Sequence, residues 1–113
     1  MVFGAWQPLD QAGATAPPVP GVLQIRGDAL IDLPRGKSAM ILYAASQTDE
    51  PLDRFVTGPG AALLARAAGE GARYVRFAPA ARPQHELLRL LANFDERFGA
   101  LPPANRTAPA RRS

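Results

Sequence analysis

Residues 73–99, RYVRFAPAARPQHELLRLLANFDERFG, contain the two clearest structural signals in the chain. The first five residues roughly alternate in polarity, which indicates a half-buried strand with Tyr74 and Phe77 as aromatic anchors. From Pro83 to Gly99, apolar residues recur at helical spacing, and this pattern predicts a long amphipathic helix. The apolar stripe consists of Leu87, Leu88, Leu91, Phe94 and Phe98. A strand followed by such a helix favours a sheet that the helix covers.

Further strands are predicted upstream of this segment. Val22–Ile25 is rich in β-branched and apolar residues, Gly27-Asp28 is a turn signal, and Ala29–Leu33 is again apolar, so a hairpin is expected there. Residues 34–36 interrupt the chain. The apolar run that follows, within Ala39–Ala45, favours a central buried strand.

The segment between the predicted strands is helical in character. A short helix is expected from a cap at Thr48 or Asp49 to Gly58, and a second one over Ala61–Ala68 with Gly69 as a left-handed C-terminal cap. The sequence therefore predicts an α/β (α+β) fold, in which a small and mostly antiparallel sheet of three to five strands is covered by about three helices.

Three regions follow from these elements. Residues 1–19 form an N-terminal extension, in which Met1–Trp6 adds an edge strand or places its tryptophan over the core, and Gln7–Pro20 is an extended, partly Pro-rich surface segment. Residues 20–105 form one domain. Residues 106–113 are expected to be a mobile basic tail.

The composition limits the classes of function. The 113 residues suffice for one domain, and the absence of cysteine excludes disulfides, thiol nucleophiles and thiolate zinc sites. No apolar run approaches the roughly 20 residues that cross a bilayer, so we expect a cytoplasmic protein with no membrane partner. The net charge is +3, and Lys37 is the only lysine among 13 basic residues. Arginine suits bidentate contacts to phosphate, so a nucleic-acid partner is compatible with this composition.

Common catalytic motifs are incomplete in this chain. Residues 35–38, Arg-Gly-Lys-Ser, are similar to the end of a phosphate-binding loop, but Ile31 stands where an earlier glycine is required, and the segment leads into a strand. His85 is the only histidine, which excludes a site with several histidine ligands. Neither Ser38 nor Ser46 lies in a nucleophile elbow. Glu86, at the margin of the apolar stripe, either holds a hard divalent cation or is a first-turn glutamate stabilised by the helix dipole.

Six segments occur in an order that is informative when they are taken together. They are PGVLQI (20–25), ILYAAS (41–46), LDR (52–54), YVRF (74–77), HELL (85–88) and FGALPPAN (98–105). In this order they resemble the GIY-YIG nuclease domain, over most of residues 20–105. In that family two tyrosines lie on adjacent strands, an arginine follows on the next helix, and a glutamate on a later helix binds one divalent metal. An asparagine near the end of the domain often completes the site.

The resemblance implies a catalytic set in this chain. It consists of Tyr43, Arg54, Glu86 and Asn105, with Glu86 as the ligand of Mg²⁺ or Mn²⁺. Leu23 stands where the first signature has tyrosine, and leucine cannot orient or deprotonate a water molecule. The implied activity is metal-dependent DNA endonuclease activity, that is phosphodiester hydrolysis, with weakened chemistry.

Three functions stay open at this point. The first is a divergent nuclease in which a group near Lys37 or His85 replaces the missing tyrosine. The second is a catalytically inactive module that binds nucleic acid, DNA in preference to RNA, through an arginine-bearing face. The third is a protein-interaction domain that uses the Pro-rich segment and apolar surface to bind a protein partner. The candidate nucleic-acid contacts are Lys37, Arg54, Arg73, Arg76 and Arg89. The oligomeric state does not follow from the sequence.

Overall fold

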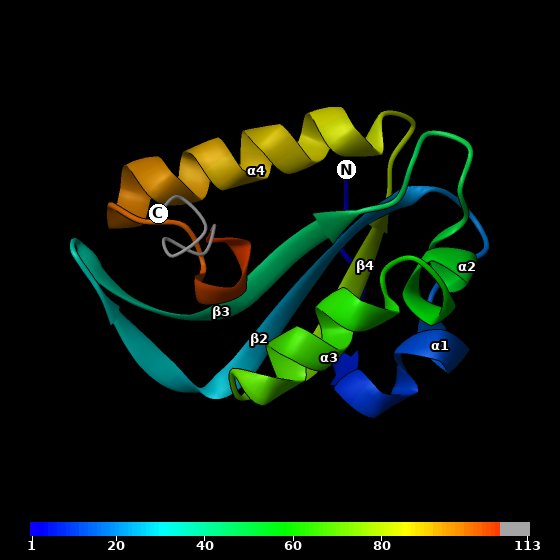
Figure 1. Cartoon of the computed structure of the whole chain (residues 1–113). Helices are drawn as coiled ribbons and strands as arrows, with labels where there is room; N and C mark the ends of the chain where they lie inside the picture. The colour runs from blue at the N-terminus through cyan, green and yellow to red at the C-terminus, as the bar shows by residue number, and fades with distance from the viewer. Residues whose placement is uncertain (107–113) are drawn as a thin grey trace, which may run out of the picture.

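The computed structural model describes residues 1–106 and contains one antiparallel sheet of four strands (Figure 1). The strands are β1 (Gln7–Pro8), β2 (Gly21–Leu33), β3 (Gly36–Ala45) and β4 (Ala72–Pro79), in the spatial order β1-β4-β2-β3. This arrangement confirms the predicted class of a small antiparallel sheet combined with helices. The predicted mobile tail is residues 106–113, and all of it except Arg106 lies outside the described residues.

Helices cover both faces of the sheet. They are α1 (Ala12–Thr15), α2 (Leu52–Thr57), α3 (Ala61–Gly69) and α4 (Pro83–Phe98), with the short 3₁₀ turns η1 (Leu9–Gln11) and η2 (Pro103–Asn105). Figure 1 shows α4 along one side of the sheet and α1, α2 and α3 on the other. No helix within residues 1–106 has the length and apolar character needed to cross a membrane.

The alternation of side chains along β2 divides the core into two parts. Leu23 and Ile25 face α1, α2 and α3, where they pack with residues such as Leu52 and Phe55 in the larger cluster. Val22 faces the other way and joins a smaller cluster beneath α4. Successive residues of a strand point to opposite faces, so each side of the sheet receives its own set of apolar residues.

The predicted turn at Gly27-Asp28 is wrong. β2 continues to Leu33, and the chain reverses only between Leu33 and Gly36. The pairing of β2 with its neighbours is irregular around Arg26, as expected for a bulged strand. A Cβ atom at Gly27 would lie 2.7 Å from the carbonyl oxygen of Gly71. The glycine therefore allows two backbone segments to approach closely.

The N-terminal segment is more ordered than the sequence predicts. Residues 7–20 contain β1, η1 and α1, so the expectation of an extended segment is wrong for much of it. Ala12 is buried in the larger core cluster. The carbonyl oxygens of Pro17 and Val19 accept hydrogen bonds from the first N–H groups of α2 at Asp53 and Leu52. No side-chain cap is formed at the start of α2, and these backbone hydrogen bonds take the place of the expected one.

The structure confirms α4 between Pro83 and Gly99, where Gly99 adopts a left-handed φ of 80°. The predicted stripe is wrong at Leu88, which is 68% exposed. Leu90 instead packs against the smaller core cluster, and Phe94 is buried. The predicted left-handed cap at Gly69 is also wrong. Gly69 is the last residue of α3, and the positive φ, 99°, occurs at Gly71.

Candidate functional site

Tyr43 lies on β3 with only 8% of its surface exposed. Its ring packs edge-on against Phe94 of α4, with 5.8 Å between the ring centroids. Burial raises the pKa of the Tyr43 hydroxyl, and the positive charge of Arg76 acts in the opposite direction. The hydroxyl therefore keeps its proton at neutral pH and is suited to hydrogen bonding.

Asn105 holds the backbone of Tyr43 at the free edge of the sheet. Its Oδ1 accepts a hydrogen bond from the Tyr43 N–H, and its Nδ2 donates one to the Tyr43 carbonyl oxygen, each at 2.8 Å. The side-chain amide thus pairs with the edge strand as a neighbouring strand would. A guanidinium N–H of Arg66 donates to the carbonyl oxygen of Ala104, so η2 is also tied to α3.

Asn105→Ala is expected to lower the free energy of unfolding by about 1 to 3 kcal/mol, because two backbone groups lose their partners. Chemical denaturation with and without the substitution measures this difference. Asn93→Ala is the matched control, since Asn93 is exposed on α4, and it should change stability by no more than about 0.5 kcal/mol. Equal effects of the two substitutions would contradict the edge-pairing role of Asn105.

Glu86 lies in the first turn of α4 and contacts Arg89. The Oε1 atom of Glu86 accepts hydrogen bonds from Nε and Nη2 of Arg89 at 2.9 and 2.6 Å, and these bonds lower the pKa of the carboxyl. Within residues 1–106, no three His, Asp or Glu side chains come together in a way that could hold a metal. One carboxylate engaged by an arginine does not fit a divalent-cation site, which normally uses several oxygen ligands. Metal binding by Glu86 stays a prediction of the resemblance.

The other predicted cations lie apart from Tyr43. Arg54 is exposed on α2, which packs on the face of the sheet opposite to the Tyr43 ring. The ammonium of Lys37 lies 3.4 Å from Asp32. Arg73 lies 4.0 Å from Asp28, and all four side chains of these two pairs are largely exposed. Such exposed pairs contribute little to stability.

Arg76 is the predicted cation that lies near Tyr43. In the sheet register, Gln24 of β2 lies opposite Tyr43 of β3 on one side and opposite Arg76 of β4 on the other. Residues directly opposite each other in a sheet project from the same face. The Nε atom of Arg76 donates a hydrogen bond of 2.7 Å to Oε1 of Gln24. The three side chains thus form a row across the face that carries α4.

The same register corrects the position assigned to the missing tyrosine. Leu23 pairs with Ala44, points into the larger core and is fully buried. In the resemblance, two tyrosines lie side by side on adjacent strands. The residue opposite Tyr43 on the adjacent strand β2 is Gln24. A glutamine therefore stands where the resemblance requires the second hydroxyl.

Beside this row, two guanidinium groups alternate with three aromatic rings. Arg76 lies 4.9 Å from the ring centroid of Phe3 and 4.5 Å from that of Trp6. Arg26 lies 4.9 Å from Trp6 and 5.0 Å from Tyr74. The order is Phe3, Arg76, Trp6, Arg26, Tyr74, and we call this set the aromatic–arginine ladder. Cations over ring faces at these distances attract the rings and hold the guanidinium planes in place.

Positive charge accumulates in the ladder without a neutralising carboxylate. Within residues 1–106, neither Arg26 nor Arg76 has a carboxylate oxygen within 4.0 Å, although three other basic residues do. Burial lowers the pKa of Arg76, with Tyr43 opposing this effect and the positive charge of Arg26 adding to it. The Nε of Arg26 is buried and has no hydrogen-bond partner among the described residues. The ladder therefore offers two fixed cations to an anionic ligand.

Five residues of the site were not predicted from the sequence: Phe3, Trp6, Gln24, Arg26 and Tyr74. The sequence holds a signal for three of them. Gln24 and Arg26 occupy alternate positions of one strand, and Tyr74 alternates with Arg76 on another. The N-terminal aromatics carry no comparable signal.

Comparisons of the chain with protein-family models, with curated proteins and with solved structures found no match. The chemistry of the site is therefore inferred from its own residues.

Proposed function

We propose that this chain is a nucleic-acid-binding module that uses the aromatic–arginine ladder as its binding surface. The observation that carries the proposal is the pair of half-buried arginines, Arg26 and Arg76, held between aromatic rings without a carboxylate within 4.0 Å in the described residues. The Nε of Arg76 is bonded to Gln24 and the Nε of Arg26 is buried, so a ligand would use the terminal N–H groups of the two guanidiniums for in-plane hydrogen bonds. Phosphate oxygens match such donors in charge and geometry.

Single strands suit this surface better than duplexes. Tyr74 ends the ladder on one side, so one face of its ring is covered by no ladder arginine, and the side chain is half-buried. Phe3, at the other end, packs against the smaller core cluster. A nucleobase stacks on such a face only when it is free of its own neighbours, as in a single strand. Phosphates on the two arginines and a base on the Tyr74 ring would use both parts of the ladder.

The proposal does not include hydrolysis. Tyr43 faces a glutamine, Arg54 lies on a helix of the opposite face, and the Glu86 carboxylate is bound by Arg89. The resemblance to the GIY-YIG domain supports a nucleic acid as the ligand. The disposition of these residues favours the second of the three functions, a module that has lost catalysis.

The test is a titration of fluorescently labelled single-stranded DNA, followed by anisotropy, with EDTA in one series and Mg²⁺ in another. The proposal predicts saturable binding in both series, and a clear loss of affinity as the salt concentration rises to about 0.15 M or above. Absence of binding at low salt would contradict the proposal and favour the protein-interaction alternative.

A separate prediction concerns catalysis. Supercoiled plasmid incubated with the protein and Mn²⁺ or Mg²⁺ is expected to remain intact, both with the wild-type chain and with Glu86→Ala. The physical reason is that general-base assistance is worth about 10²- to 10⁴-fold in rate, and the residue paired with Tyr43 on β2 is a glutamine and not a tyrosine. Nicking by the wild type that disappears in Glu86→Ala would replace the binding-module proposal by a metal-dependent nuclease.

A further inference from the structure

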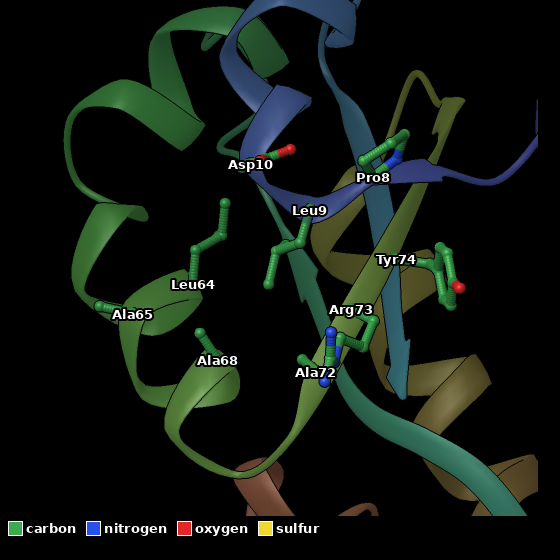
Figure 2. A pocket seen from close by; sticks show the side chains of 9 residues that line it. All are labelled: Pro8, Leu9, Asp10, Leu64, Ala65, Ala68, Ala72, Arg73 and Tyr74. Carbon is green, nitrogen blue, oxygen red and sulfur yellow. The ribbon is translucent and has the colours of Figure 1, made fainter. Parts of the chain in front are cut away.

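A cavity of about 570 Å³ lies between α3, η1 and β4, away from the sheet face that carries the ladder (Figure 2). Its lining includes Leu9, Asp10, Leu64, Ala68, Arg73 and Tyr74. The ring of Tyr74 points away from the cavity in Figure 2, and it stacks on Arg26 of the ladder. The cavity and the ladder therefore lie on opposite sides of β4.

Most of the residues that line the cavity are apolar. Figure 2 shows Leu9 of η1 and Leu64 of α3 extending into the space between these two elements. α3 has the sequence AALLARAAG, yet Ala67 is its only fully buried residue, and Ala68 is exposed beside the cavity. A helix of this composition usually covers its apolar surface, so the cavity suits an apolar ligand. The volume lies in the range of small-molecule sites, about 300 to 1,000 Å³.

Two charged side chains in the lining, Arg73 and Asp10, limit which polar groups a ligand of this cavity can carry. Among the described residues that line the cavity, Arg73 carries the only positive charge, and its partner Asp28 lies 4.0 Å away in an exposed position. Such a pair is weak, so a ligand carboxylate or sulfonate competes with Asp28 for the guanidinium. Asp10 also lines the cavity and disfavours a second anionic group.

We propose that this cavity binds a small amphipathic organic anion, with an apolar body between Leu9 and Leu64 and a single carboxylate or sulfonate on Arg73. No ladder arginine lines the cavity, and Tyr74, which belongs to both the lining and the ladder, points its ring away from the cavity. Ligands of this class include medium-chain fatty acids and aryl sulfonates.

The test uses anilinonaphthalene sulfonate as a fluorescent probe and octanoate as a competitor. The wild-type chain is expected to bind the probe saturably at one site, with displacement by octanoate. Ala68→Trp, which fills the cavity, should weaken binding at least about 10-fold, and Arg73→Gln should weaken it about 10-fold through the lost charged hydrogen bond. Ala62→Trp is the matched control, since Ala62 is exposed on the same helix but does not line the cavity.

Circular dichroism and thermal melting establish that each variant is folded before binding is compared. Equal probe affinity in the wild type, Ala68→Trp and Arg73→Gln would overturn the proposal, as would the absence of saturable binding by the wild type. If Ala68→Trp does not fold, the probe affinities of Arg73→Gln and Arg97→Gln are compared instead. Weaker probe binding in Arg73→Gln alone supports the site, and equal probe affinities of the two variants overturn it.

Discussion

Replacement of both Arg26 and Arg76 by glutamine is expected to lower the affinity for single-stranded DNA by about 100-fold at low salt. Each guanidinium is held between two rings and offers charged donors, and one charged hydrogen bond is worth about 1.5 to 3 kcal/mol, roughly a 10- to 100-fold change in affinity. The loss should shrink as salt increases, because the wild-type contacts are electrostatic. Anisotropy titrations of the two chains side by side give the ratio.

Arg97→Gln supplies the control for this experiment. Arg97 lies 5.0 Å from the ring centroid of Phe98, so it is also an arginine stacked on an aromatic ring, but it belongs to α4 and not to the ladder. Its loss should change the affinity less than about 2-fold if position in the ladder matters more than total charge. The double variant removes two positive charges and Arg97→Gln removes one. If Arg97→Gln lost half as much binding free energy as the double variant, net charge alone would account for binding.

Gly21→Ala is expected to destabilise the fold by about 3 kcal/mol or more. A Cβ atom at this position would lie 2.2 Å from the carbonyl oxygen of Ala78 and 2.8 Å from Cδ1 of Leu52. The backbone cannot easily move away, because Ser46 N–H donates to the Gly21 carbonyl at 3.0 Å and Gly21 N–H donates to Ser46 Oγ at 3.1 Å. Overpacking against fixed backbone costs at least as much as core overpacking, which is typically about 1 to 3 kcal/mol.

Urea denaturation measures this loss, and Gly69→Ala is the matched control. A Cβ atom at Gly69 meets nothing within 4 Å, and the residue belongs to α3. Alanine has the higher helix propensity, so this variant should be unchanged or up to about 1 kcal/mol more stable than the wild type. If Gly21→Ala were as stable as Gly69→Ala, the close approach of β2 and β4 would be wrong.

Local sequence signals predicted the elements whose causes are local. α4 begins at a proline and ends at a left-handed glycine, and both limits are encoded within a few residues of each terminus. The exposed position of Leu88 and the buried position of Leu90 depend on how α4 sits on the sheet, which periodicity alone does not determine. Gly27 gave a turn signal, but the reason for glycine there is the distant carbonyl of Gly71.

The candidate site was harder to predict because strand register creates it. A shift of one residue decides whether Leu23 or Gln24 faces Tyr43, and register is a property of two strands together. The ladder also needs the N-terminal segment, whose short strand pairs with β4 from more than 60 residues away: Gln7 lies opposite Val75. No pattern near Trp6 reveals that pairing.

The most direct test of the nucleic-acid site uses the single tryptophan of the chain. Trp6 lies between Arg26 and Arg76, at the centre of the ladder, so its fluorescence reports on that surface without any label. Titration with single-stranded DNA at low salt is predicted to change the Trp6 emission saturably, and salt should reverse the change. DNA that binds without altering this emission, or no binding at all, would contradict the assignment of the ladder as the nucleic-acid site.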